Sequence, residues 1–222
     1  MPFYCIYTYP LCFGGARLDG STATRDAQGN EIHDHFFGQS SFGTFALAND
    51  RNVVKVPKEA PLELLGPLGC GIQTGAGAVI NVLPVGAGSS FAVFGAGAVG
   101  LSAVMAARVS GATTIIAADV VPSRLELAKR LGATHPVNSK DQDPVEAIRE
   151  ITGGGADATL EATGIPAVLR QAIDAVGVTG TCGIVGAAPL GAEASFDVND
   201  VMIPGKQIRG ILQGESIPKL FI

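Results

Sequence analysis

The chain has 222 residues, which suits one large domain or one domain with a fragment of another. Because 47% of the residues are apolar and 16% are charged, the chain can bury a substantial core, and its composition excludes disorder. The net charge of −5, without any basic run, gives no electrostatic basis for binding nucleic acid or an anionic membrane.

Targeting signals and cysteine usage point to a cytoplasmic setting. No run of about 18 apolar residues is free of Gly, Pro and charge, so we expect no transmembrane helix. The N-terminal residues lack the basic and apolar regions of a secretory signal. The cysteines at positions 5, 12, 70 and 182 are too scattered for a disulfide framework, so we expect a reducing compartment.

The first 84 residues give mixed signals. Residues 21–40 are polar and predict a loop, and the alternating residues 41–56 predict two short strands separated by Asn49 and Asp50. Residues 61–82 predict two helical pieces broken by a Gly-rich corner, with Pro84 closing the segment.

From residue 89, short apolar runs alternate with stretches of helical periodicity. This alternation predicts an α/β fold, a Rossmann doubly wound parallel sheet of six strands covered by helices. The expected strands are 91–94, 114–118, 135–138, 158–161, 182–185 and 208–212, and the expected helices are 99–109, 123–131, 144–151 and 166–176.

The strongest motif is a Gly-rich turn between the first of these strands and its helix. Residues 95–100 read Gly-Ala-Gly-Ala-Val-Gly, a GxGxxG pattern in the required strand-turn-helix context. Gly95 allows the sharp turn, Gly97 lets a pyrophosphate approach the backbone, and Gly100 lets the helix pack on the strand. Together with Ala98 and Val99, they place free N–H groups and a helix N-terminus where phosphates can bind.

An acid follows at the end of the next strand. Asp119 lies 19 residues after Gly100, where a ribose-binding carboxylate is expected. A carboxylate there would repel a 2′-phosphate, so the sequence favours NAD over NADP, although Arg124 is close enough in sequence to accommodate that phosphate. The plainer alternative is that Asp119 only caps the helix at 123–131.

Methyltransferases that use S-adenosylmethionine also combine a Gly-rich turn with an acid at a strand end. The full GxGxxG spacing and the lack of a recognisable antiparallel final hairpin argue against that class here.

Few residues suggest a metal site. Cys70 stands alone, and a single cysteine is most often a small buried hydrophobe. His33 and His35 are too isolated to form a recognisable zinc pattern, and His135 opens a strand and is expected to be structural.

These residues together resemble the zinc-dependent medium-chain alcohol dehydrogenases. The carrying segments are 69–77 (GCGIQTGAG), 93–101 (VFGAGAVGL) and Asp119. The segments 13–20, 34–42 and 63–68 resemble the aryl-alcohol (benzyl-alcohol) dehydrogenase branch.

The resemblance implies roles for individual residues. Cys70 corresponds to a catalytic zinc ligand, and Thr74 to a residue that contacts the nicotinamide. Val185 and Gly186 correspond to the strand end that packs on the nicotinamide ring, and Arg124 to a basic neighbour of the ribose. The implied reaction is hydride transfer between an alcohol or aldehyde, as small-molecule partner, and NAD, with zinc polarising the oxygen.

The resemblance also has gaps. No counterpart of the other catalytic zinc ligands is found, and Cys5 alone corresponds to one of four structural zinc ligands, so we expect a chain truncated at both ends that holds neither zinc alone. We expect residues 1–60 to be a β-rich remnant of a GroES-like catalytic domain, 61–84 a connecting helical segment and 85–222 an incomplete NAD-binding domain.

Two other functions stay open. One is a zinc-free NADPH quinone reductase of the same superfamily, which Cys70 and Asp119 oppose. The other is a non-catalytic nucleotide-binding or dimerising module, because the resemblance implies that subunits join through strand 208–212 as a homo-oligomer.

Overall fold

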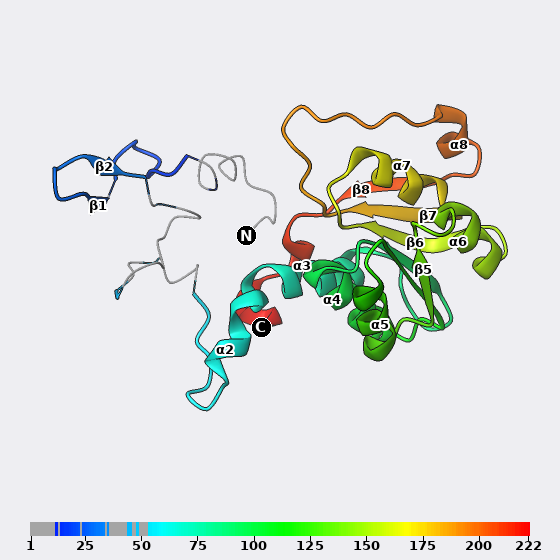
Figure 1. The fold of residues 1–222 in the computed structure, drawn as a ribbon, viewed down its shortest axis with the longest axis horizontal. Helices are drawn as coiled ribbons and strands as arrows, with labels where there is room; N and C mark the ends of the chain where they lie inside the picture. Colours follow the sequence, from blue (N-terminus) through cyan, green and yellow to red (C-terminus); the bar gives the residue numbers. More distant parts are fainter. Residues whose placement is uncertain are drawn as a thin grey trace. The chain divides into compact units, whose positions relative to one another are not determined.

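The structure is a computed structural model that describes residues 12, 14–22, 24–33, 35, 44, 45, 48 and 53–222. The chain forms two compact units (Figure 1). The first is Met1–Pro61 with Pro218–Leu220 and Ile222, and the second is Leu62–Ile217 with Phe221.

The described part of the first unit contains one small hairpin. Strand β1 (Thr24–Arg25) pairs antiparallel with β2 (Glu31–Ile32). Asp26 holds the connecting turn, because its Oδ1 accepts hydrogen bonds from the backbone N–H of Gln28 and of Asn30. A hairpin therefore interrupts the segment predicted as a loop.

Two short strands were predicted over residues 41–56. Much of the first lies outside the described residues. Over residues 53–56 the chain forms no strand, so that prediction was wrong. Valine favours a strand, but a strand also needs a neighbour for its N–H and C=O groups, and none pairs with 53–56 in the described part.

The second unit is built on a six-stranded sheet of order β5-β4-β3-β6-β7-β8, and every neighbouring pair is parallel. This confirms the doubly wound parallel sheet. The strands are β3 (Ser90–Phe94), β4 (Thr114–Asp119), β5 (His135–Asn138), β6 (Ala156–Glu161), β7 (Val176–Ile184) and β8 (Gln207–Gly210).

Helices cover both faces of this sheet. Apolar side chains of α4 (Ala98–Val109) and α5 (Pro122–Leu131) pack with Phe91, Val93 and Ile115 in one core cluster. Those of α6 (Pro144–Thr152) and α7 (Pro166–Asp174) pack with Phe94 and Ile116 in the other. Alternate residues of each strand thus serve opposite layers. The helices and helical turns are α2 (Leu62–Leu65), η2 (Gly66–Gly69), α3 (Gly71–Gly77), η3 (Ala78–Val82), α4 (Ala98–Val109), α5 (Pro122–Leu131), α6 (Pro144–Thr152), α7 (Pro166–Asp174), α8 (Val198–Met202), η4 (Gln213–Glu215) and α9 (Pro218–Phe221).

The strand order places a switch point between β3 and β6. Successive strands β3, β4 and β5 run outward on one side, and β6, β7 and β8 run outward on the other. In such sheets, ligands bind beyond the carboxyl ends of the strands at this point.

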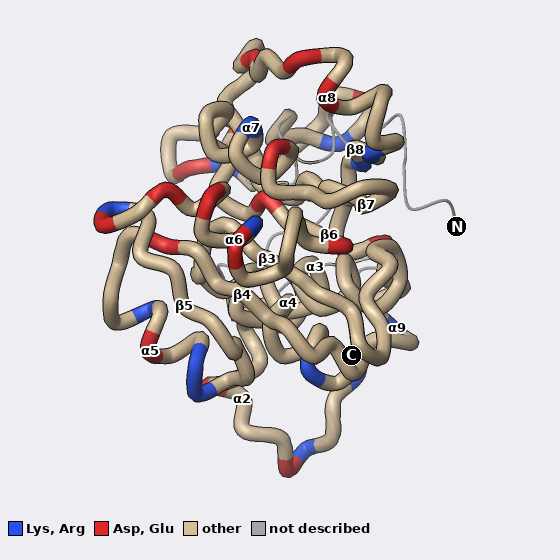
Figure 2. Tube along the Cα trace, turned by 90° about the vertical axis from the view of Figure 1, so that its right-hand side faces the viewer, with Lys and Arg blue, Asp and Glu red and all other residues tan. Residues whose placement is uncertain are grey.

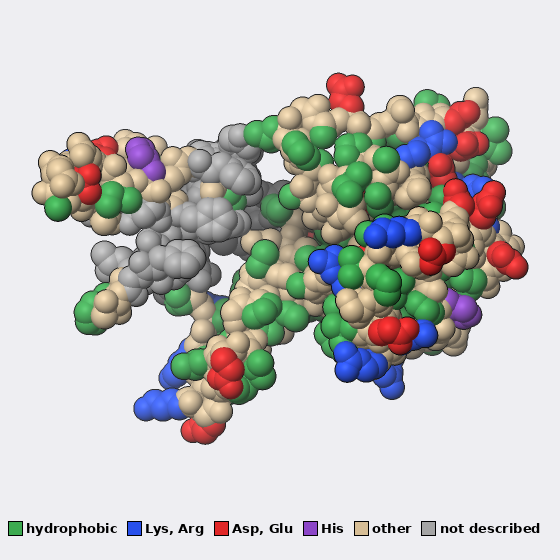
Figure 3. All heavy atoms as spheres, viewed as in Figure 1, with side chains coloured by type: hydrophobic (Ala, Val, Ile, Leu, Met, Phe, Trp, Pro, Cys, Tyr) green, Lys and Arg blue, Asp and Glu red, His purple; other side chains and the backbone are tan. Residues whose placement is uncertain are grey.

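Charged side chains on the second unit are mixed in sign. Lys and Arg lie among Asp and Glu over α5 and α6, and both the tube and the space-filling views show no broad basic face there (Figures 2 and 3). Within the ranges that the structure describes, no helix is long and apolar enough to cross a bilayer.

Candidate functional site

The Gly-rich bend lies at the carboxyl end of β3, at the switch point. Gly95 has φ +99°, a conformation that favours glycine. A Cβ on Gly100 would overlap the carbonyl oxygen of Gly95, so α4 can fold back tightly onto the bend only with glycine there. A Cβ on Gly97 would meet nothing within 4 Å, so the space beside this residue is open.

The open space faces the start of α4. Gly97 is the N-cap and has no side chain that could bond the first N–H groups of the helix. Ala98, Val99 and Gly100 form the first turn, whose N–H groups have no partner within the helix. The bend therefore offers several donors and the positive end of a twelve-residue helix to an anion.

Asp119 ends β4, and its carboxylate lies directly at this bend. Its Oδ2 accepts a hydrogen bond from Ala96 N at 2.7 Å, and its Oδ1 accepts one from Val121 N at 2.8 Å. The residue is 7% exposed, and Arg124 Nη1 lies 3.8 Å from Oδ2. Since a carboxylate has about four acceptor positions, both oxygens can still accept hydroxyl donors.

Helix α3 brings two more predicted residues to the same region. A Cβ on Gly75 would overlap the carbonyl oxygen of Val99, so α3 and α4 make backbone contact. Thr74 lies on α3 and is buried, and its N–H bonds the carbonyl of Cys70 at 2.9 Å. Cys70 precedes α3 and its side chain is exposed.

Val185 and Gly186, the two residues predicted to pack on a nicotinamide ring, follow β7. The N–H groups of Val185 and Gly186 both donate to the carbonyl oxygen of Glu161, at 3.0 and 3.1 Å. Val185 also packs against the core cluster on the α4 side of the sheet. These two residues therefore lie at the carboxyl ends of the strands, on the β6–β7 side of the switch point.

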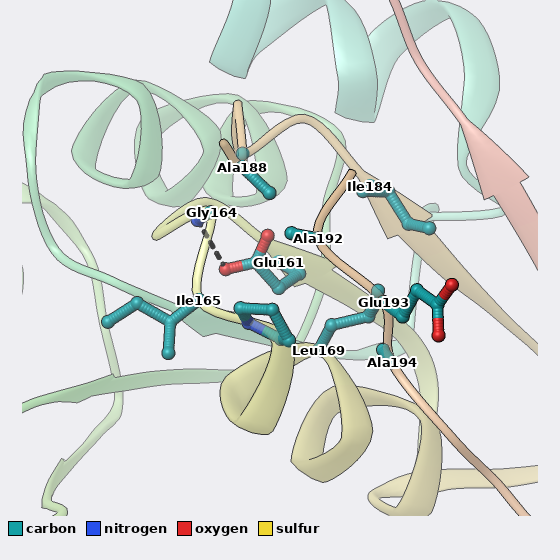
Figure 4. Close-up of a pocket in the computed structure, with 11 residues that line it drawn as sticks. Glu161, Gly164, Ile165, Leu169, Ile184, Ala188, Ala192, Glu193 and Ala194 are labelled. Carbon is teal, nitrogen blue, oxygen red and sulfur yellow. Dashed lines mark hydrogen bonds between the residues drawn. The ribbon is translucent and has the colours of Figure 1, made fainter. Parts of the chain in front are cut away.

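Sequence reasoning missed Glu161 and the turn after it. Figure 4 shows Glu161 at the end of β6, bonded to Gly164 and facing a small pocket lined by Ile165, Leu169 and Ala188. A signal was present, because an acid that directly follows the buried run of apolar and polar residues 158–160 needs hydrogen-bond partners.

Comparison with known proteins assigns the chain to a family. The family described as zinc-binding dehydrogenase matches residues 98–221. The chain belongs to the zinc-binding dehydrogenase family. It is 45% identical to geraniol dehydrogenase of Castellaniella defragrans, covering 100% of this chain and 60% of that protein.

Two solved structures share the fold of this chain. An alcohol dehydrogenase zinc-binding domain protein from Burkholderia ambifaria is 67% identical with a TM-score of 0.93. Benzyl alcohol dehydrogenase from Acinetobacter calcoaceticus is 55% identical with a TM-score of 0.89. Each alignment covers 99% of this chain and 59% of the other, so the chain spans about three fifths of these relatives.

The described residues do not fit the zinc that gives the family its name. Among them, no three His, Cys, Asp or Glu side chains come together as metal ligands. Cys70 and His33 are exposed, and His135 lies in β5 with its Nδ1 2.8 Å from Thr134 Oγ1. No chemical step is therefore assigned to zinc.

The parallel β8 also bears on the methyltransferase alternative. β8 pairs with β7 in parallel from Thr181 and Gln207 to Ile184 and Gly210, so the described sheet ends without an antiparallel hairpin. This agrees with membership of the zinc-binding dehydrogenase family.

Proposed function

We propose that this chain is the dinucleotide-binding part of an NAD-dependent alcohol dehydrogenase, which transfers hydride between an alcohol or aldehyde and NAD. The observation that carries the proposal is the meeting of Asp119 with the bend, where its carboxylate is 2.7 Å from Ala96 N. Phosphate donors and a ribose acceptor thereby lie side by side, as a dinucleotide requires.

Each part of the site would bind a different part of NAD. The first turn of α4, with Gly95, Gly97, Ala98, Val99 and Gly100, would hold the diphosphate. Asp119 would accept hydrogen bonds from the adenosine ribose hydroxyls. Thr74, Val185 and Gly186 would orient the nicotinamide, which accepts or donates the hydride when NAD is bound.

The carboxylate favours NAD over NADP. Asp119 is held by two backbone N–H groups, so it cannot easily turn away from a 2′-phosphate. Arg124 lies nearby with a half-exposed side chain. The distance of 3.8 Å between its Nη1 and Asp119 Oδ2 is longer than a direct hydrogen bond. The zinc-free NADPH quinone reductase alternative is therefore less favoured.

The substrate class rests on the relatives. The matched proteins are named geraniol dehydrogenase and benzyl alcohol dehydrogenase, so we infer an alcohol substrate, with an aryl alcohol as the specific case, for the protein of which this chain is part.

We infer that Cys70 is a zinc ligand of that protein, and we predict that this chain alone holds no zinc tightly. Metal analysis that finds about one bound zinc per chain would contradict that prediction.

A second candidate is a dimerising or purely nucleotide-binding module. β8 is an edge strand in the described sheet, and this edge is where a second copy of the chain could add its own sheet. We further infer that residues 1–60 are part of a catalytic domain, that residues 61–84 are a connector and that residues 85–222 are the NAD-binding domain of a cytoplasmic protein.

Calorimetric titration with NAD and NADP tests the cofactor proposal. The folded chain is expected to bind NAD, and to bind NADP at least tenfold more weakly, because the 2′-phosphate meets the Asp119 carboxylate. A folded chain that binds neither dinucleotide would contradict it.

A further inference from the structure

Glu161 is a buried acid to which the proposed reaction gives no role. It ends β6, between Phe94 of β3 and Ile184 of β7, and is only 1% exposed. Burying a carboxylate is costly unless its oxygens accept hydrogen bonds, so we expect the Glu161 carboxylate to have donors among the surrounding segments.

One carboxylate oxygen fixes the turn that leads into α7. Oε1 accepts hydrogen bonds from the N–H groups of Thr163, at 2.6 Å, and Gly164, at 2.9 Å, and also from the hydroxyl of Thr163. Figure 4 shows the Gly164 bond and the carboxylate inside the turn. Three donors on one oxygen leave this turn little freedom.

The same turn rests against the phosphate-binding bend. A Cβ on Gly95 would come within 2.8 Å of Thr163 Cγ2, and Ala162 N donates to Phe94 O at 2.9 Å. The position of Thr163 therefore limits where the first glycine of the bend can lie.

The second carboxylate oxygen faces the nicotinamide end. A Cβ on Gly186 would overlap both Oε2 of Glu161 and the N–H of Gly164. Gly164 itself has φ +72°, and a Cβ there would lie 2.6 Å from the carbonyl oxygen of Ala187. The turn is thus packed between the bend and the end of β7.

We propose that Glu161 is a positioning residue, which sets the spacing between the diphosphate end and the nicotinamide end of the dinucleotide site. This inference rests on the proposed function. NAD must contact both ends at once, whereas AMP needs only the end near Asp119. Loss of the Glu161 bonds therefore weakens NAD binding more than AMP binding.

The test compares NAD and AMP affinities by calorimetry in four variants of the full chain, with folding checked by circular dichroism. Glu161→Leu is expected to weaken NAD about tenfold or more and AMP less than about twofold, because all three donors lose their acceptor. Glu161→Gln keeps an acceptor oxygen and is expected to stay within about threefold of the wild type for NAD.

Two further variants separate positioning from general destabilisation. Thr163→Val removes one donor at constant shape and is expected to weaken NAD about threefold. Thr159→Val is the matched control, because Thr159 is equally buried on the same strand and face but bonds Ala172 O in α7. It is expected to lower thermal stability without changing the ratio of the two affinities.

The outcomes are distinct. Equal weakening of NAD and AMP in Glu161→Leu, or a ratio like that of Thr159→Val, overturns the inference while leaving the proposed function intact. If Glu161→Leu does not fold, an unchanged ratio in Thr163→Val overturns it. A wild-type chain that binds neither NAD nor AMP overturns the proposed function and this inference with it.

Discussion

Asp119 carries the choice of cofactor at the scale of a single residue. Asp119→Asn removes the charge but keeps one acceptor oxygen for the bend, so we expect weaker NAD binding and less repulsion of NADP. The ratio of the two dissociation constants should shift about tenfold toward NADP. Asp157→Asn is the control, because Asp157 bonds Ser90 at the start of β3, away from the carboxyl edge. An unchanged ratio in Asp119→Asn would show that this carboxylate does not meet the ribose.

Cys182 illustrates how burial controls a thiol. Burial, with a smaller effect from the nearby Glu161 charge, raises the pKa of Cys182 from 9.0 to about 11. In native protein at about pH 8, an alkylating reagent should label exposed Cys70 and leave Cys182 intact until urea is added, which peptide mass spectrometry would show. Native labelling of both residues at equal rates would contradict the burial of Cys182.

The raised pKa of Cys182 also makes stability depend on pH. Between pH 9 and about 11 the unfolded chain releases the thiol proton while the folded chain keeps it. The contribution of the neutral thiol to stability is therefore complete below pH 9 and is lost as the pH rises toward 11.

Helix α6 is stabilised by specific residues at both of its ends. Its N-cap, Asp143, accepts hydrogen bonds from Val145 N at 2.7 Å and Glu146 N at 3.1 Å, and left-handed Gly153 ends the helix. Asp143→Ala should lower the free energy of unfolding by about 1 kcal/mol, measured by urea denaturation. Asp141→Ala, an exposed acid outside the helix, should cost clearly less; equal losses would mean that the cap contributes nothing.

Most elements of the sheet unit were predictable from local patterns. Apolar runs of strand length alternate with helical periodicity, and all six strands and four helices of that alternation occur. β7 begins at Val176, earlier than predicted, because Gly177 and Gly180 interrupt the apolar pattern that indicates a strand. The register of this strand with β6 also shifts near Ala156. α8 has only five residues, too few to show a period.

The site was predictable only in part, for a physical reason. The Gly-rich bend and Asp119 depend on fixed spacing along the chain. The contact of Glu161 with Gly186 and the contact of Thr163 with Gly95 bring together segments that are far apart in the sequence, which no local pattern encodes.

At the scale of the whole molecule, the edge strand β8 predicts self-association. It is the last strand at one side of the described sheet, and pairing with a second copy there would extend the sheet across two subunits. Light scattering coupled to size exclusion should give the mass of a dimer, about twice 22.5 kDa. A monomer mass at every concentration would contradict pairing through β8.

In the proposed function, backbone N–H groups at the bend hold the dinucleotide. Amide hydrogen exchange of the chain with and without saturating NAD tests this most directly. We predict that NAD slows exchange of the N–H groups of residues 97–100 and leaves exchange in α8 unchanged. Unchanged exchange at the bend when NAD is bound, with protection elsewhere, would contradict the account.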